Sequence, residues 1–256
     1  MTNTNNHVKI ITYMGTFSEP NPYDLQARDY RSFADSSFSW RYIEAPALDE
    51  LLSDHYSRGD DVQALDFGCG NGRSTEHLIE HGINEANITG MDSSGIMIDY
   101  AADRLPQAVS LVKVNEDEGQ LPFSDESFDL VVANMVLHAM DSQRAEAAIG
   151  QIGRILMPGG DFVIVDSLPD PDVPINQSSV VQTPWGSMMK VFNHDMDALL
   201  HEVPLRHGLE CAVEKKPLKV DEVGREADLG EYTRYTTGHF RLAAVLHKPE
   251  AVSEDQ

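Results

Sequence analysis

Three glycines alternate with other residues in the segment that follows an early apolar run, Leu65-Asp66-Phe67-Gly68-Cys69-Gly70-Asn71-Gly72. Because glycine has no Cβ, such a turn lets the backbone approach a ligand closely, and a helix that begins there directs free N–H groups at it. In the dinucleotide fingerprint G-x-G-x-x-G the third glycine would fall at position 73, but Arg73 occupies that position and the glycine comes one residue earlier. A phosphate loop is also excluded, because no Gly-Lys-Ser/Thr follows the glycines. The spacing therefore indicates a ligand that is bulky and not strongly anionic.

An acidic residue follows the next apolar run. Asp92 lies twenty residues after Gly72, directly after the expected strand Ile88–Met91. In a doubly wound sheet, a carboxylate at that point can accept hydrogen bonds from both ribose hydroxyls. An acid before a helix is often only a helix cap, but the position after a glycine turn favours ligand binding. The sequence therefore predicts a ligand that contains a ribose.

The elements that must position these residues alternate regularly between about residues 62 and 167. Short apolar runs alternate with stretches whose apolar residues recur every three or four positions, which is typical of βαβ units around a parallel sheet with helices on both faces. The expected strands are Val62–Phe67, Ile88–Met91, Val109–Val114, Phe128–Ala133 and Phe162–Val165, and the expected helices are Ser74–His81, Ser94–Leu105 and Arg144–Leu156.

The two ends of the chain do not follow this alternation. Residues 1–60 are predicted to form an N-terminal helical cap, or lid, with helices at Tyr23–Phe33 and Trp40–Tyr56 that precede the sheet and do not belong to it. Residues 251–256 are polar and are expected to be a frayed tail.

The main domain is expected to span residues 61–250. An insertion over about 168–207, which would wall the substrate site, begins with a stretch rich in Pro and Asp and continues with an expected helix at Ser187–Leu205. Two further strands are expected at Leu209–Val220 and Phe240–His247.

Four motifs occur in this alternation: D-F-G-C-G-N-G at Asp66–Gly72, Asp92, Leu121-Pro122-Phe123 with Ser127–Val132, and Arg154–Gly160. In their order and spacing they resemble the motifs of the class I S-adenosylmethionine-dependent methyltransferases. The resemblance is to the small-molecule type, similar to methyltransferases of quinone and natural-product biosynthesis. It implies a Rossmann-like three-layer α/β/α sandwich around a seven-stranded, mostly parallel sheet with an antiparallel last strand. It also implies S-adenosylmethionine as cofactor and S-adenosylhomocysteine as product.

The resemblance implies which residues hold the cofactor. The glycine turn would contact its methionine and ribose portions, Asp92 its ribose hydroxyls and Met97 its adenine face, although Met97 could equally be a core residue. In many relatives an acidic residue before Leu-Pro-Phe binds the adenine amino group. Here the residues before Leu121 differ from the usual pattern, and spacing favours Asp117, with Glu118 as the alternative. The expected cofactor residues are Tyr23, Asp66, Gly68, Cys69, Gly70, Gly72, Asp92, Ser93, Met97, Asp117, Glu118 and Asn134.

Two residues are candidates for catalysis. His138 lies just beyond the fourth expected strand, and its neutral imidazole could remove a proton from an acceptor hydroxyl or amine. In many relatives the same histidine is a structural hydrogen-bond donor. Tyr30 shares a helix face with Tyr23, and one of the two could attract the positive sulfonium through a cation–π contact. Methyl transfer is an in-line displacement that alignment in a dry site can accelerate, so no catalytic triad is required.

Aromatic and apolar side chains in the insertion and before the last strand are expected to select the acceptor. They favour an aromatic or heterocyclic small molecule as acceptor. The alternative is that these side chains are aromatic or apolar because they pack in the core. The expected substrate residues are Trp185, Met189, Phe192, Tyr235 and His239.

The charge balance excludes some partners. The 256 residues include 19 Lys and Arg against 42 Asp and Glu, a net charge of −23. Such a surface repels phosphate backbones and anionic lipids, so neither nucleic acid nor a membrane is an expected partner. The sequence has no apolar stretch of signal-peptide or membrane-spanning length, which favours a cytoplasmic location. The oligomeric state stays open.

No metal site or disulfide is expected. Cys69 and Cys211 lie far apart, with no further Cys or His at metal-ligand spacing. Four other histidines fall on expected exposed helix faces or helix ends and build no metal cluster by spacing, namely His77, His81, His201 and His207.

Three functional hypotheses follow. The first is a methyltransferase that acts on an N, O or C nucleophile of a small molecule. The second is an enzyme of the same fold that uses S-adenosylmethionine itself as substrate and releases methylthioadenosine. The third, a binding or scaffold protein without activity, is disfavoured because the glycine turn and Asp92 are intact.

Overall fold

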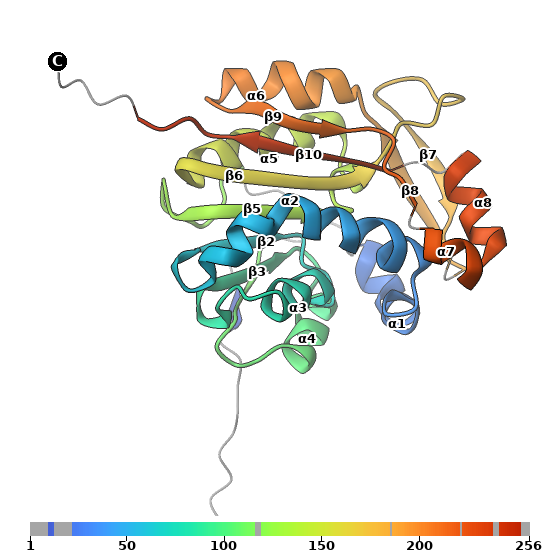
Figure 1. The fold of residues 1–256 in the computed structure, drawn as a ribbon, viewed down its shortest axis with the longest axis horizontal. Coiled ribbons are helices and arrows are strands. Elements are labelled where there is room, and N and C mark those ends of the chain that lie inside the picture. The colour runs from blue at the N-terminus through green and yellow to red at the C-terminus, as the bar shows by residue number, and fades with distance from the viewer. Residues whose placement is uncertain are drawn as a thin grey trace, which may run out of the picture.

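An eight-stranded sheet with the order β1-β4-β3-β2-β5-β6-β10-β9 forms the centre of the computed structural model (Figure 1), which describes residues 10–12, 22–115, 119–184, 186–220, 222–237 and 241–251. Strand β10 is antiparallel to both of its neighbours, and the other strands run parallel to one another. Without β1, this is the predicted seven-stranded sheet with an antiparallel last strand, so the fold class is confirmed. The strands are β1 (Ile10–Thr12), β2 (Ala64–Phe67), β3 (Ile88–Asp92), β4 (Ser110–Lys113), β5 (Phe128–Asn134), β6 (Leu156–Ser167), β9 (Glu210–Lys215) and β10 (Arg241–His247).

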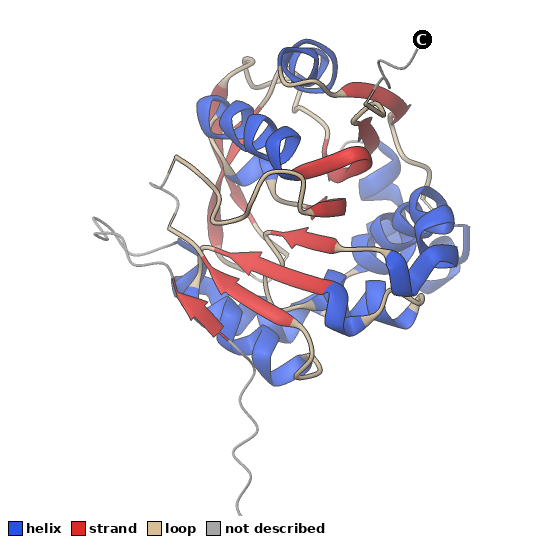
Figure 2. Cartoon of the chain, turned by 90° about the vertical axis from the view of Figure 1, so that its left-hand side faces the viewer, coloured by secondary structure: helices blue, strands red, loops and turns tan. Residues whose placement is uncertain are grey.

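Helices cover both faces of this sheet (Figure 2). One face carries α2 (Ala45–Arg58), α3 (Arg73–Glu80) and α4 (Gly95–Arg104), and the other carries α5 (Ser142–Ile155), η5 (Ala198–Glu202) and α6 (Val203–Arg206). The remaining helices are α1 (Pro22–Ala34), η1 (Trp40–Glu44), η2 (Gly59–Asp61), η3 (Glu85–Asn87), η4 (Leu137–Ala139), α7 (Glu222–Ala227) and α8 (Leu229–Thr237).

Alternate residues of the central strands belong to different hydrophobic cores. Leu65 and Val131 pack in the core under α5 and α6, whereas Leu130 and Val132 pack under α2, α3 and α4. Successive side chains of a strand point to opposite faces of a sheet. Because both faces are covered, both sets must be apolar, which explains why the sequence shows continuous apolar runs.

The segment between β6 and β9 differs from the prediction of a single helix at Ser187–Leu205. Its first part is strand β8 (Met188–Asn193), which pairs with β7 (Gln177–Gln182) in a separate antiparallel hairpin, and helical structure begins only at residue 196. Apolar residues at positions 188, 189, 191 and 192 fit a helical period as well as a short strand. The prediction was wrong because this strand depends on its partner β7.

The N-terminal part of the chain contributes to the sandwich as well as to a cap. The two expected helices are present as α1 and as η1 with α2, but Leu48 and Leu52 of α2 are fully buried in the core under the sheet. Strand β1 lies parallel to β4 at the edge of the sheet, which the sequence did not indicate. Three residues are too few to show a periodicity.

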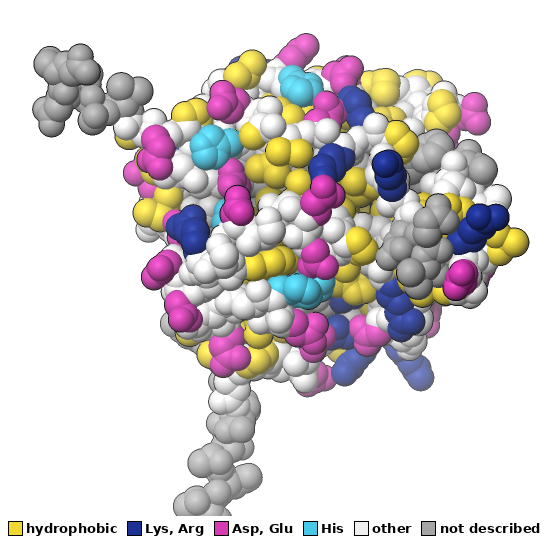
Figure 3. All heavy atoms as spheres, in the orientation of Figure 1, with side chains coloured by type: hydrophobic (Ala, Val, Ile, Leu, Met, Phe, Trp, Pro, Cys, Tyr) yellow, Lys and Arg dark blue, Asp and Glu magenta, His cyan; other side chains and the backbone are white. Residues whose placement is uncertain are grey.

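Charged side chains cover the surface unevenly. Figure 3 shows acidic groups scattered over the whole visible face, while Lys and Arg gather mainly toward the side that carries α1, α7 and α8. The negative charge on this face therefore does not form one patch. Among the described residues, no helix combines the length and the apolar character that crossing a membrane requires.

Candidate active site

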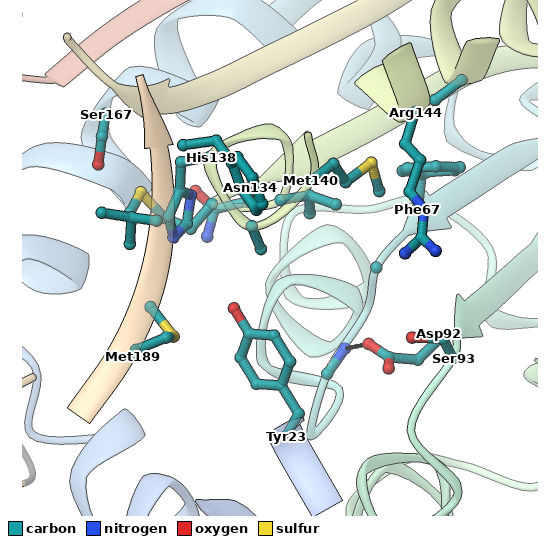
Figure 4. Close-up of a pocket in the computed structure, with 18 of the residues that line it drawn as sticks. Tyr23, Phe67, Asp92, Ser93, Asn134, His138, Met140, Arg144, Ser167 and Met189 are labelled. Carbon is teal, nitrogen blue, oxygen red and sulfur yellow. Dashed lines mark hydrogen bonds between the residues drawn. The ribbon is translucent and has the colours of Figure 1, made fainter. Parts of the chain in front are cut away.

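A cavity of about 1030 Å³ lies at the carboxyl ends of β2, β3, β5 and β6. Ligands of open α/β sheets bind at this edge, because the loops that follow the strands converge there. Helices α1 and α8 and the β7–β8 hairpin supply the other walls. Figure 4 shows Tyr23 of α1 and Met189 of β8 at the cavity. The expected site residues that line the cavity are Tyr23, Tyr30, Gly68, Cys69, Gly70, Asp92, Ser93, Met97, Asn134, His138, Met189, Phe192 and Tyr235.

Two expected cofactor residues do not line the cavity. Asp66 is buried beneath the glycine turn, where its Oδ2 accepts a hydrogen bond of 2.6 Å from the hydroxyl of Thr75. Gly72 precedes α3 with a φ of +83°, and a Cβ at this position would lie 2.9 Å from Leu105 Cδ1. Both residues therefore support the turn from behind. Four others lie outside the described residues, namely Asp117, Glu118, Trp185 and His239.

The glycine turn is fixed against the neighbouring strand by its backbone. The N–H groups of Gly68 and Cys69 both donate to the carbonyl oxygen of Met91 at 2.8 Å. Gly70 has a φ of +53°, and a Cβ added there would meet no atom within 4 Å. The turn thus presents a bare stretch of backbone to the cavity.

Asp92 links the glycine turn to the loop that begins α4. Its Oδ2 accepts the N–H of Gly70 at 2.9 Å, and its Oδ1 accepts the N–H of Ser94 at 2.8 Å. The carboxylate lies at the cavity wall next to Ser93 (Figure 4). It therefore stands in a fixed position where a polar ligand can reach it.

Helix α1 of the cap is fastened to the same loop. The Ser94 hydroxyl donates to Asp24 Oδ1 at 2.5 Å, and the N–H of Ile96 approaches this oxygen at 3.4 Å. Figure 4 shows the ring of Tyr23 pointing into the cavity, with its hydroxyl toward Asn134 and His138. Tyr30, two turns further along the same face of α1, also lines the cavity. The cap thus closes one side of the site.

His138 is held by an aspartate that the sequence analysis did not identify. Asp166, at the carboxyl end of β6, lies with its Oδ1 2.8 Å from His138 Nδ1. Among the described residues, no protein atom hydrogen-bonds the other ring nitrogen, Nε2. Burial alone would raise the pKa of Asp166, but the adjacent His138 and the backbone N–H donors outweigh it and hold this pKa below its ordinary value. Asp166 is therefore ionised and fixes the orientation of the imidazole.

Arg154 connects the Leu-Pro-Phe motif with the motif that begins at Arg154 itself. Its Nη2 donates to the carbonyl oxygen of Leu121 at 3.0 Å, and its Nη1 donates to that of Phe123 at 2.8 Å. Gln151 of the same helix accepts the N–H of Leu121 at 3.2 Å. The Leu-Pro-Phe loop, of which Leu121 lines the cavity, is thereby clamped to α5.

Apolar side chains form the wall opposite the glycine turn. Met189 and Phe192 come from β8, and Tyr235 comes from α8. The Tyr235 ring also stacks on Phe38 with centroids 5.8 Å apart, so it is part of a small core between cap and α8 as well as a cavity wall. His194, which directly follows β8, also lines the cavity; it is buried, and its Nε2 lies 2.8 Å from the carbonyl oxygen of Leu137.

Buried polar atoms at the cavity fit the cofactor that the motifs imply. Asn71 Nδ2 and Asn134 Oδ1 have no hydrogen-bond partner among the described residues, and both side chains line the cavity. An unpaired buried donor and acceptor are costly unless a ligand satisfies them. With the open backbone at Gly70 and the carboxylate of Asp92, they match the amino, carboxylate and ribose groups of S-adenosylmethionine. Burial raises the pKa of the Cys69 thiol, which makes it a neutral wall residue.

Comparisons with known proteins agree with this geometry. The profile of the family described as a methyltransferase domain matches residues 64–160. An uncharacterized methyltransferase of Synechocystis is 36% identical over 104 residues, which cover 41% of this chain and 46% of that protein. The phthiotriol/phenolphthiotriol dimycocerosates methyltransferase of Mycobacterium tuberculosis is 29% identical over 180 residues, or 63% of this chain and 64% of that protein. This chain thus spans less than two thirds of either relative.

A solved structure shows the same fold. The 1,6-didemethyltoxoflavin-N1-methyltransferase of Burkholderia thailandensis, with 1,6-didemethyltoxoflavin and S-adenosylhomocysteine bound, superposes with a TM-score of 0.54 over 93% of this chain and 94% of its own, at 20% identity. The strand order, the motifs in place at the cavity and the family profile lead to one assignment. Residues 64–160 form a methyltransferase domain, and the chain has the fold of S-adenosylmethionine-dependent methyltransferases.

Proposed function

We propose that this protein transfers the methyl group of S-adenosylmethionine to a nitrogen, oxygen or carbon nucleophile of a small aromatic or heterocyclic molecule. One observation carries the proposal. A single cavity has the glycine turn and Asp92 on one side, and His138 and an apolar wall on the other. Its volume of about 1030 Å³ lies at the upper end of the range of small-molecule sites, so it suits a cofactor together with a small acceptor.

The cofactor side of the cavity is built from residues of three loops. The backbone at Gly70 and the side chain of Asn134 would bind the methionine portion, Asp92 the ribose, and Met97 the adenine. When bound, S-adenosylmethionine supplies an electrophilic methyl group on a positively charged sulfur. The carboxylate of Asp92 is already fixed by the N–H groups of Gly70 and Ser94, so it does not need to be ordered when the ligand arrives.

His138 is suited to act as a general base toward an acceptor hydroxyl or amine. Since the carboxylate of Asp166 only accepts hydrogen bonds, His138 Nδ1 carries a hydrogen, and in the neutral form of the ring the lone pair is on Nε2. Nε2 would take the proton of the acceptor as the new bond to carbon forms. Asp166 would stabilise the imidazolium that results, as carboxylates do in other His–Asp pairs.

The cap and the hairpin would exclude water and select the acceptor. Tyr23 and Tyr30 of α1 close one side, held there by the bond from Ser94 to Asp24. Met189 and Phe192 offer an apolar surface for a flat acceptor. The Burkholderia structure has 1,6-didemethyltoxoflavin and S-adenosylhomocysteine bound, which supports a small-molecule acceptor for this chain.

The test is to incubate the purified chain with S-adenosylmethionine, with and without a panel of phenols, aromatic amines and nitrogen heterocycles, and to follow all products by mass spectrometry. We expect S-adenosylhomocysteine to form only when an acceptor is present, together with a product heavier by one methylene. Methylthioadenosine formed from the cofactor alone would instead favour the enzyme that uses S-adenosylmethionine as its substrate. Failure of S-adenosylhomocysteine to bind in calorimetry would contradict both.

A further inference from the structure

Three side chains that could ligate a metal converge outside the cavity, at the contact between α2 and α3. Asp49 Oδ1 lies 2.8 Å from His77 Nε2 and 3.4 Å from His81 Nε2. The two imidazole rings are 4.1 Å apart, and the three possible ligand atoms all lie within 4.8 Å of one another. None of the three residues lines the cavity.

The helical spacing brings the two histidines together. Residues four positions apart lie on one helix face, so His77 and His81 present their rings side by side. Helices α2 and α3 lie next to each other on one face of the sheet (Figure 1), with Leu52 and Leu78 in their shared core. This packing supplies Asp49, which lies 28 positions before His77 in the chain. The third ligand was therefore invisible to local spacing, and His77 is buried although the sequence indicated a solvated histidine.

The hydrogen bonding of His81 leaves a lone pair directed at the cluster. Its Nδ1 lies 2.8 Å from the backbone carbonyl oxygen of His77. Because a carbonyl can only accept, Nδ1 carries the hydrogen and the neutral ring has its lone pair on Nε2. That nitrogen lies 3.4 Å from the carboxylate oxygen of Asp49, so a cation shared by the two atoms, either a proton or a metal ion, would hold them together. A backbone carbonyl that orients the far nitrogen is also the usual arrangement around a metal-bound histidine.

Solvent can reach the cluster from one side. The side chains of Asp49 and His81 are 43% and 38% exposed, whereas that of His77 is 10% exposed. The rings of Trp40 and Tyr56 border the two histidines with centroids 5.2 Å away. An ion could therefore enter from solvent and retain water in its remaining position, while the buried side keeps the ligands ordered.

We propose that Asp49, His77 and His81 bind one Zn²⁺ ion. Two imidazoles and a carboxylate are ligands that zinc prefers, and three protein ligands leave a fourth position for water. The ion would join the α2 helix to α3, which begins directly after the glycine turn. It would thus brace the cofactor side of the cavity from outside without contacting any ligand there.

A second cluster with similar residues provides the matched control. Asp197, His201 and Glu214 are also close enough to share an ion, but Lys216 Nζ already lies 2.9 Å from Asp197 and 2.6 Å from Glu214. This ammonium group neutralises the carboxylates and repels a metal cation. We therefore expect no zinc at that cluster.

The experiment measures zinc binding to the full chain, purified without a polyhistidine tag, by competition with a chromogenic chelator and by calorimetry with ZnCl₂. Four chains are compared: the unmodified protein, His81→Gln, Asp49→Asn and the control His201→Gln. We expect one Zn²⁺ per chain, an affinity at least about tenfold weaker in the first two variants, and no change in the control. His81 and Asp49 are partly exposed, so the variants should fold, which thermal unfolding without metal checks.

Two further readouts are independent of any enzymatic activity. Zinc should raise the unfolding temperature of the unmodified chain and of His201→Gln but not of His81→Gln, because an ion that binds only the folded state stabilises it. Co²⁺ should give visible absorption bands that His81→Gln loses. The proposal is overturned if the unmodified chain binds no zinc. It is also overturned if His81→Gln and Asp49→Asn bind zinc as the unmodified chain does, since the cluster would then share only a proton.

Discussion

His138 Nδ1 lies 2.8 Å from Asp166 Oδ1, and the other oxygen of the same carboxylate accepts the backbone N–H groups of Val136 and Leu137 at 3.1 and 2.7 Å. The aspartate therefore fixes both the imidazole ring and the loop that carries it. Because Asp166 ends a central strand, this arrangement is anchored in the rigid sheet. Such anchoring is what a proton-accepting group needs in order to meet its substrate at a defined distance.

Replacement of His138 should separate binding from turnover. In His138→Gln we expect the affinity for S-adenosylhomocysteine to change little, while kcat for a hydroxyl or amine acceptor falls by about 10²- to 10⁴-fold, the usual contribution of a general base. Calorimetry and single-turnover methyl transfer measure the two effects. His201→Gln, at an exposed histidine on η5, is the control. Wild-type turnover in His138→Gln would show that the ring only positions the loop.

Asp92 should contribute most of the binding of the ribose. A hydrogen bond to a charged group is worth about 1.5–3 kcal/mol, so Asp92→Ala should weaken S-adenosylhomocysteine binding by about 10- to 100-fold or more. Asp99→Ala removes an exposed carboxylate of α4 and should leave the affinity unchanged. Because Asp92 also holds Gly70 and Ser94, thermal unfolding of the variant must be measured beside calorimetry. Unchanged affinity would refute the ribose assignment.

The central strands and the glycine turn could be predicted from sequence because their signals are local. A strand buried on both faces is a continuous apolar run, as at Phe128–Ala133, and a turn with positive φ angles needs glycines such as Gly68 and Gly70. Asp66 and Gly72 belong to the same motif, yet they lie behind the turn. Spacing alone does not tell which side of a backbone faces a ligand.

The parts that were missed depend on contacts between distant segments. Asp166 follows the expected strand Phe162–Val165 as Asp92 follows its own strand, so the same rule would have found it. Its role becomes visible only with His138 beside it. Likewise, Met188–Asn193 is a strand because Gln177–Gln182 pairs with it.

Gly70 and Gly72 should respond differently to an added methyl group. At Gly70 a Cβ meets no protein atom within 4 Å, so Gly70→Ala should lose only about 1–2 kcal/mol for its left-handed φ. The methyl group would nevertheless stand at the cavity wall and should reduce the affinity for S-adenosylhomocysteine. At Gly72 a Cβ lies 2.9 Å from Leu105 Cδ1 and 3.3 Å from the backbone of Ala101, so Gly72→Ala should mainly lower stability. Urea unfolding and calorimetry distinguish the two, and wild-type affinity in Gly70→Ala would contradict the site.

Asp66 should make the protein less stable as the pH rises. Burial raises the pKa of this carboxyl group to about 7, although the hydrogen bond from the Thr75 hydroxyl lowers it in part. Between about pH 4 and pH 7 the unfolded chain has lost this proton while the folded chain keeps it. The free energy of unfolding therefore falls as the pH rises through this window and stays constant above it.

Asp66→Asn removes this titration, because an amide has no proton to lose in this range. Relative to the unmodified chain, the variant should gain stability on going from about pH 5 to pH 8, by a difference on the order of 1–4 kcal/mol. Urea unfolding at both pH values measures it, and taking the difference between the two chains cancels every other titrating group. Asp99→Asn, at an exposed position, should show no such difference. Parallel pH profiles for Asp66→Asn and the unmodified chain would contradict the raised pKa of Asp66 in the folded protein.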